Sequence, residues 1–396
     1  MRKRIRWTAA VLAAVMLILP GLAGAEVLGF GFVNNTDVAV RREPGGKSVG
    51  RLPEDTCVWI LDSRTDKKGT LWYRINAGLN QNYANWDYSG WMMAQFIDAG
   101  DDVWHDVISV SALHQGMIAV RSDGTAEVAG RPKVSKDGSR WISTRGRAAA
   151  LLPIVQATAY WGNDYAFMTE DGRVHGVEYD DSTYIDDCLR IMTGLDFVFG
   201  IGRDNRLKSV LRGVHQNLRW IWPESEPAAA ETARVVQMAS MDGRVLMRTE
   251  DGRVMAAGWG QDSYREPEPD WSRWTGIASI AAGNIYIIPD ESNQAAAVGV
   301  REDGTLAVWP SALEKLIGGW TDMAEVQLSL HGAIGLKRDG TAVSVGWSGY
   351  PAVDVSGWTD VTAVANGEDY GVGLKEDGTL VFAGEHVFMN EGHNKK

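Results

Sequence analysis

Short stretches of alternating apolar and polar residues, separated by Gly, Pro and Asp, run along most of the chain. A period of two is typical of β-strands with one buried face, and Gly, Pro and Asp are favoured in tight turns. In one such stretch Val58 and Ile60 alternate with Cys57 and Trp59, so we expect Val58 and Ile60 to face a core. The pattern predicts an all-β protein.

Residues 26–100 hold four of these stretches and predict a small β-barrel. Their order and spacing resemble the bacterial Src-homology-3-type domain. The resemblance covers nearly all of 30–97 and lies in Val38-Ala39-Val40-Arg41, Pro44-Gly45, Leu52, Val58, Ile60, Trp72-Tyr73 and Gly90-Trp91. It implies a module that attaches to cell-wall peptide or glycan, or one that serves only as a structural partner of the next domain.

The stretch 76–89 is longer and richer in Asn and aromatic residues than the tight loop that the resemblance implies. It holds Tyr83, Trp86 and Tyr88, whose flat amphipathic rings could form a binding platform for a sugar or peptide. The alternative, which we favour, is that these rings fold over the barrel or dock it on the second domain.

Residues 101–396 contain an internal repeat marked by an acidic turn. Asp-Gly, or once Asp-Asn, recurs about every 42 residues, at Asp123, Asp171, Asp204, Asp251, Asp303, Asp339 and Asp377. These dipeptides accept the positive φ that hairpin turns demand. Apolar residues usually stand five and three positions before the turn Asp, as at Val372 and Leu374. The fourth unit has Arg248 there, which leaves its register open.

Each repeat supplies three to four strands, the size of one blade of a β-propeller, and seven blades is the favoured count. The last unit reads Trp-Thr-Asp-Val from Trp358, an alternating strand, Leu-Lys-Glu-Asp-Gly-Thr-Leu from Leu374, and a closing Ala-Gly. This resembles the repeats of the regulator of chromosome condensation family, which implies a propeller over most of 105–384. Founding members of that family act on a nuclear GTPase and chromatin, which an exported acidic chain does not reach, so we carry over only the fold.

Residues 1–25 predict a cleaved export signal, because four basic residues within the first six precede an apolar run and Ala23-Gly24-Ala25 follows it. The expected mature protein starts near Glu26 and is extracellular or associated with the cell wall. Without 1–25 the chain has 35 basic and 51 acidic residues, a net charge of −16. Of this charge −15 falls on 101–396, which disfavours nucleic acid and anionic lipid as partners.

The sequence offers no catalytic constellation, metal motif or cofactor-binding loop. Two cysteines, Cys57 and Cys188, exclude a disulfide scaffold, and we expect two unlinked thiols. The seven histidines show no metal-ligand spacing. An acidic cluster could bind calcium, but a solvated loop explains it better; it comprises Asp180, Asp181, Asp186 and Asp187.

These observations predict a secreted, non-catalytic binding or scaffold protein. Its barrel would contact the cell envelope, and its propeller would present loops to a protein or glycan partner. The expected contact loops are 132–153, 179–190, 213–232 and 261–273; they hold Trp220, Trp222 and Trp271, for which packing between blades is an equal alternative. One rival function is a carbohydrate-active hydrolase with paired carboxylates at the mouth of the propeller channel. Another is a barrel that binds nothing and only braces the ring.

Overall fold

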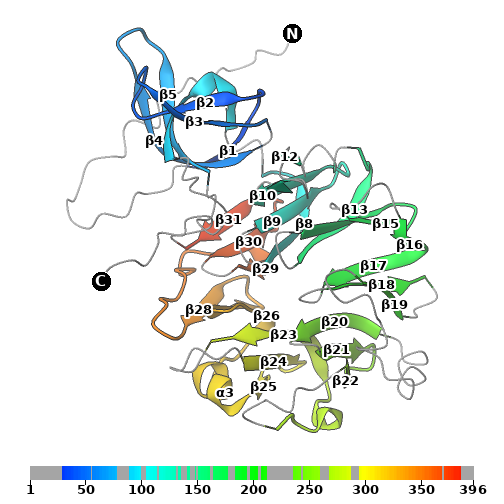
Figure 1. Ribbon diagram of the computed structural model, residues 1–396. Coiled ribbons are helices and arrows are strands. Elements are labelled where there is room, and N and C mark those ends of the chain that lie inside the picture. The colour runs from blue at the N-terminus through cyan, green and yellow to red at the C-terminus, as the bar shows by residue number, and fades with distance from the viewer. Residues whose placement is uncertain are drawn as a thin grey trace, which may run out of the picture.

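The structure is a computed structural model, shown in Figure 1. It describes residues 29–54, 56–77, 89–99, 104–113, 116–130, 133–134, 141–142, 148, 150–160, 164–176, 183–193, 197–203, 207–211, 235–241, 244–258, 267–286, 294–367 and 370–384. The predicted export signal lies outside these residues. Within them, no helix has the length and apolar character needed to span a bilayer.

An N-terminal sheet of seven antiparallel strands has the order β3-β2-β6-β5-β4-β1-β7. The strands are β1 (Gly29–Val33), β2 (Val38–Arg41), β3 (Ser48–Leu52), β4 (Cys57–Thr65), β5 (Leu71–Asn76), β6 (Ser89–Met93) and β7 (Ile97–Ala99), with a 3-10 turn η1 (Ala94–Phe96) between the last two. Alternate residues of these strands share one core. Val58 and Ile60 belong to it, as the alternation predicts, and so do Leu52 and Ile75.

Among the described residues, seven antiparallel sheets of three or four strands follow, named here the first to the seventh in chain order. The first three are β8 (Val107–Leu113), β9 (Gly116–Arg121) and β10 (Ala126–Gly130); β13 (Ile154–Tyr160), β14 (Asp164–Thr169), β15 (Val174–Gly176) and β16 (Thr183–Ile185); and β17 (Cys188–Thr193), β18 (Phe197–Gly202) and β19 (Leu207–Leu211). The fourth and fifth are β20 (Val235–Met241), β21 (Arg244–Thr249) and β22 (Val254–Gly258), and β23 (Ile277–Ile285), β24 (Gln294–Arg301) and β25 (Leu306–Trp309). The sixth and seventh are β26 (Met323–Leu328), β27 (Gly332–Lys337) and β28 (Ala342–Gly346), and β29 (Val361–Asn366), β30 (Gly371–Lys375) and β31 (Leu380–Ala383).

Smaller elements occupy the connections between sheets. A two-stranded sheet of β11 (Lys133–Val134) and β12 (Trp141–Ile142) follows the first sheet, inside one of the expected contact loops. A 3-10 turn η4 (Trp271–Arg273) precedes the fifth sheet, and the helix α3 (Ser311–Ile317) follows it.

The sheets succeed one another around a common centre (Figure 1), and the first strand of each sheet contacts the first strand of the next. We call these first strands the inner strands; they are β8, β13, β17, β20, β23, β26 and β29. β29 in turn contacts β8. The all-β class and the propeller-type arrangement predicted from the repeated turns are confirmed.

The apolar pairs before each turn are buried, as their period of two predicts. Val372 and Leu374 of β30 are examples, with Ile334 and Leu336 of β27 at the same places in the sixth sheet. The fourth sheet has the same strand register as the other sheets, which answers the question that Arg248 raised in the sequence. Arg248 pairs with Val254 across the hairpin as Leu336 pairs with Ala342, so a half-buried arginine occupies a position that is elsewhere apolar.

The repeated Asp-Gly turn forms the contact between neighbouring sheets. The backbone N–H that opens an inner strand donates to the carbonyl of the turn glycine in the preceding sheet. The pairs and their N···O distances are Ile154 to Gly124 2.8 Å, Cys188 to Gly172 2.9 Å, Ile277 to Gly252 2.9 Å, Met323 to Gly304 3.1 Å, Val361 to Gly340 3.0 Å and Val107 to Gly378 2.9 Å. The last pair joins the first sheet to the seventh. We call this contact the turn seam.

Glycine is required at the turn seam for two reasons. Gly378 has φ +79°, which glycine adopts without the steric cost of a side chain. A Cβ there would also lie 3.1 Å from Cα of Asp106, the residue before β8. Gly304 approaches Asp322 in the same way, since its Cβ would lie 2.9 Å from Cα of that residue. The backbones of neighbouring sheets therefore touch at a place where no side chain fits.

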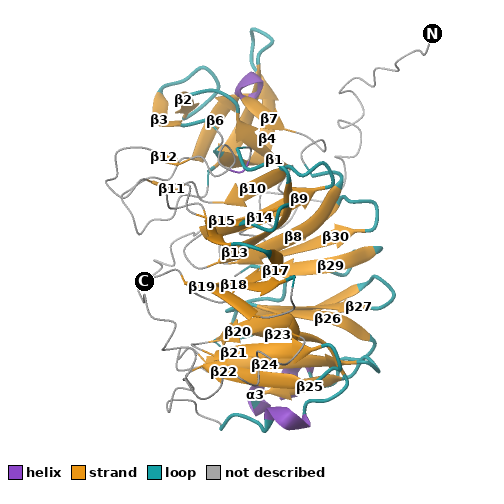
Figure 2. Cartoon of the chain, turned by 90° about the vertical axis from the view of Figure 1, so that its right-hand side faces the viewer, coloured by secondary structure: helices purple, strands orange, loops and turns teal. Residues whose placement is uncertain are grey.

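The N-terminal sheet docks where the first and seventh sheets meet. Phe32 of β1 is fully buried in a core that also contains Trp104, Val107 and Tyr370. The centroids of Phe32 and Trp104 are 6.3 Å apart, and Trp104 contacts Phe382 of β31 edge to face at 6.2 Å. Figure 2 shows the N-terminal sheet at this end of the molecule, beside β9 and β10.

Replacing Gly378 by Ala should destabilise the fold more than replacing Gly349 by Ala. Both residues have positive φ, +79° and +84°, so each change carries the left-handed cost of about 1–2 kcal/mol. No atom lies within 4 Å of a Cβ at Gly349. The clash with Asp106 should add about 1–3 kcal/mol at Gly378 alone. Urea unfolding of both variants measures the difference, and equal losses would contradict the seam as described.

The turn aspartates should make stability fall in acid. In the Glu-Asp-Gly-Thr turns the hydroxyl and then the backbone N–H of Thr305 and Thr379 donate to Asp303 and Asp377, which lowers the pKa of both carboxyls. A folded-state pKa below the unfolded value means that this stabilisation is complete above about pH 4 and is lost as pH falls further.

We therefore expect the double variant Asp303→Asn, Asp377→Asn to show a shallower loss of stability below pH 4 than the wild type, because its amide oxygens accept hydrogen bonds but do not titrate. The measurement is the urea midpoint as a function of pH. Glu302→Gln, Glu376→Gln removes the same charge from exposed neighbours in the same turns and should leave the acid branch as it is. An identical acid branch in both double variants would refute the prediction.

Candidate functional site

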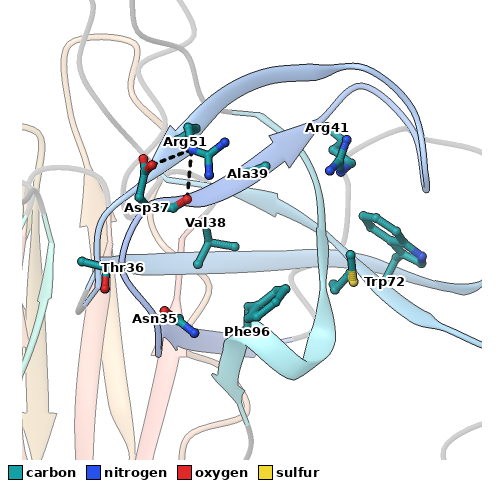
Figure 3. A pocket seen from close by; sticks show the side chains of 10 residues that line it. Asn35, Thr36, Asp37, Val38, Ala39, Arg41, Arg51, Trp72 and Phe96 are labelled. Atoms are coloured by element: carbon teal, nitrogen blue, oxygen red, sulfur yellow. Dashed lines mark hydrogen bonds and ion pairs between the residues drawn. The ribbon is translucent and has the colours of Figure 1, made fainter.

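A groove of about 300 Å³ opens on the N-terminal sheet (Figure 3). It is bounded by the β1–β2 loop, β2, the end of β3, β5, β6 and η1. The side chains that line it are those of Asn35, Thr36, Asp37, Val38, Ala39, Arg41, Arg51, Trp72, Met93 and Phe96. One part of the lining is polar and cationic, and the other is apolar.

An ion pair lies at the polar rim of the groove. Arg51 Nε is 2.8 Å from Oδ2 of Asp37 and donates to the backbone carbonyl of Asp37 at 3.0 Å (Figure 3). Asp37 has φ +59°, a conformation that Asp accepts more readily than most residues, and this turns its carboxylate toward β3. Both side chains are more than half exposed, so the pair adds little stability and its guanidinium stays accessible to a ligand.

On the apolar side of the groove, a hydrogen bond to Asp66 fixes the ring of Trp72. Trp72 of β5 is buried, and its indole N–H donates to Oδ2 of Asp66 at 3.0 Å. The backbone N–H of Thr70 and then this indole lower the pKa of Asp66, so the acceptor is ionised and fixes the ring. Met93 and Phe96 are half-buried and complete this side. At the other rim Arg41 Nη1 donates to the carbonyl of Gly46 at 2.8 Å.

The groove can bind a ligand that carries an anionic group beside an apolar one. Arg41 and Arg51 offer guanidinium donors, which pair well with carboxylates, and the half-buried Met93 and Phe96 offer apolar area. Among its lining residues Asp37 is the single carboxylate, and it already pairs with Arg51. The groove therefore lacks the two facing carboxyl groups that glycoside hydrolysis needs.

Most of the aromatic residues proposed from the sequence as ligand contacts lie outside the described residues. These are Tyr83, Trp86, Tyr88, Trp220 and Trp222. Trp271 is described and is half-buried in η4. It packs edge to face on Trp274 and Trp309, with centroids 5.0 and 6.1 Å apart, and donates from Nε1 to Glu268 at 3.0 Å. These contacts give Trp271 a packing role, while its role toward a ligand stays a prediction.

The acidic cluster is described only in part, since Asp180 and Asp181 lie outside the described residues. Asp186 and Asp187 face arginines: Arg173 Nε lies 3.6 Å from Asp186, and Arg203 Nε lies 3.5 Å from Asp187. Within the described part of the chain, no three acidic, histidine or cysteine side chains gather as metal ligands would.

Cys188 is buried between the second and third sheets. The side chain of Cys57 lies outside what the structure describes. Two unlinked thiols therefore remain a prediction.

The groove residues were not predicted as a site from the sequence. Arg41 and Trp72 belong to the motifs that carry the resemblance of 30–97, but their side chains meet only when β2, β6 and β5 lie side by side. Asn35, Asp37 and Arg51 belong to no motif. A motif search detects the strands of the groove but misses the rim formed by Asn35, Asp37 and Arg51.

No protein-family model matches the chain, and no curated protein sequence is significantly similar to it. Solved structures that resemble it include the CRINKLY WD40 ectodomain of the Arabidopsis thaliana receptor kinase ACR4, at 12% identity and a TM-score of 0.46, over 71% of this chain and 95% of that one. Yeast RCC1 (Prp20) bound to Kap60 has 15% identity and a TM-score of 0.36 over 72% of each chain.

PorZ, a bacterial surface component of the type-IX secretion system of Porphyromonas gingivalis, has 13% identity and a TM-score of 0.34, over 70% of this chain and 36% of PorZ. Likenesses this distant carry no argument about function. The assignment of the fold rests on the sheets and on the contacts between their inner strands.

Proposed function

We propose that the protein is a secreted, non-catalytic binding protein of the bacterial cell envelope. In this proposal the N-terminal sheet is a Src-homology-3-like barrel that contacts cell-wall peptide or glycan. The seven sheets are the blades of a closed propeller related to the regulator of chromosome condensation repeats, which presents loops to a protein or glycan partner.

The observation that carries the proposal is the groove on the N-terminal sheet. Its guanidinium groups and apolar side fit the peptide of a cell wall, where carboxylates alternate with small apolar side chains. The ring supports this role by holding the sheet rigidly through Phe32, so that the groove opens away from a fixed base. The predicted export signal at 1–25 would bring the chain to the envelope.

The proposal is tested in the full mature chain, because removal of the N-terminal sheet would expose the core around Phe32. Arg51→Gln should lower cosedimentation with purified cell walls about tenfold at low salt, the size expected when one charge-assisted hydrogen bond is lost. Arg42→Gln removes the same charge from an exposed neighbour outside the groove and should sediment like the wild type.

Unfolding curves of both variants should stay close to that of the wild type, since Arg51 and Asp37 are exposed. Envelope attachment through the groove is wrong if Arg51→Gln sediments normally. It is also wrong if the wild-type chain itself does not bind the walls.

A further inference from the structure

Two arginines with no acidic partner among the described residues lie where the third and fourth sheets meet. Arg190 of β17 donates from Nη1 to the carbonyl of Val236 at 2.7 Å. Arg248 of β21 donates from Nε to Oε1 of Gln237, the next residue of β20, at 3.3 Å. Both guanidinium groups are therefore anchored on consecutive residues of one inner strand. The pKa of Arg248 is lowered by burial and by the charge of Arg190, as expected for neighbouring cations.

Two other sheets form a side-chain bridge from the position that Arg190 occupies. The counterpart of Arg190 in the second sheet is Gln156, whose amide bonds both the carbonyl and the N–H of Ile191, at 2.7 and 2.8 Å. Gln237 bridges to Ile280 in the same way, at 3.0 Å for both bonds. Arginine has no acceptor and makes only half of such a bridge. At the other position Arg248 replaces the buried apolar residue of the other sheets.

Two arginines at one junction place two charges where each costs stability, because a part-buried charge loses hydration. The opposing charge that would compensate this cost is absent among the described residues. A bound anion would supply it.

Exposed apolar side chains occupy one equivalent position near the start of the first three inner strands. Each inner strand has a bulge at its second residue, just after the turn seam. In the first three sheets that residue is Ile108, Val155 or Leu189, exposed by 54%, 40% and 43%. Leu189 precedes Arg190 in the chain, and Val236, which accepts the hydrogen bond of Arg190, stands at the same bulge position of β20. We call Ile108, Val155 and Leu189 the apolar rim.

We propose that Arg190 and Arg248 bind a carboxylate of an acidic peptide segment whose neighbouring apolar side chains lie on the apolar rim. The occupant follows from the chemistry: two guanidinium groups favour a carboxylate, and the exposed aliphatic residues of the apolar rim, with Leu189 next to Arg190 in the chain, favour aliphatic side chains. The inference deepens the proposed role of the ring in binding a protein partner, and it is independent of the groove.

The test uses the full mature chain and labelled peptides that alternate leucine with glutamate, followed by fluorescence anisotropy. Matched peptides carry glutamine for glutamate or serine for leucine. We expect the leucine–glutamate peptide to bind at least tenfold more tightly than either matched peptide, because each loses one of the two interactions. Equal binding of the three peptides would overturn the proposal. A competition experiment with inorganic phosphate gives a second check: if phosphate binds and the leucine–glutamate peptide does not displace it, the proposal is also wrong.

The deciding variant is Arg248→Leu, which restores the apolar residue that most other sheets carry at this position. Its Tm should rise by roughly 2–4 °C while peptide affinity falls at least tenfold. Arg253→Leu removes an exposed arginine of the same sheet that pairs with Asp251 at 2.7 Å, and it should leave affinity unchanged. If Arg248→Leu lowers Tm or keeps full affinity, Arg248 is a packing residue and the site does not exist. Cell-wall sedimentation of Arg248→Leu should match the wild type, so failure here and failure of the groove proposal are separable.

Discussion

The contact of each turn glycine with the next inner strand is the constraint on which the rest of the ring depends. Among the described residues, each of the seven sheets is built from strands that are consecutive in the chain. The backbone bond from Val107, which opens β8, to the turn residue Gly378 joins the first sheet to the seventh and has the same form as the bonds between sequential sheets. A seam that repeats along the chain can also join its two ends, because the six junctions where the structure describes the turn glycine share the same hydrogen bond.

The junction between the first and seventh sheets differs from the others in what covers it. Phe32 comes from the N-terminal sheet and fills the core that those two sheets share, with Leu61 packed beside it. Burial of a phenylalanine side chain contributes roughly 1.5–3 kcal/mol. This contribution falls at the junction that lacks a direct chain connection. The N-terminal sheet thus packs on the first and seventh sheets through Phe32, and the groove is lined by other residues of the same sheet.

The repeat could be predicted from the sequence because it depends on local rules. The Asp-Gly turns, the period-two pairs such as Val372 and Leu374, and the Trp-Thr openings are each short patterns with a direct structural cause. Trp104 was missed as the opening of the first repeat, although Trp-His-Asp-Val shares its first, third and last residue types with the opening at Trp358. The groove and the contact of Phe32 with Tyr370 could not be predicted, since they join segments that no local pattern relates.

Arg248 departs from the repeat, and this departure points to function rather than to packing. In a ring of similar units, packing alone would favour the same solution at each equivalent position, and most sheets follow it with Val120, Met168, Val300, Leu336 and Leu374. Arg248 first suggested a shifted register, but the strand pairing excludes that explanation. What remains is an arginine that sacrifices apolar burial in one sheet, next to a second arginine that donates to the same inner strand. A part-buried pair of like charges at one junction is hard to account for by stability, and binding of an anion gives the pair a cause.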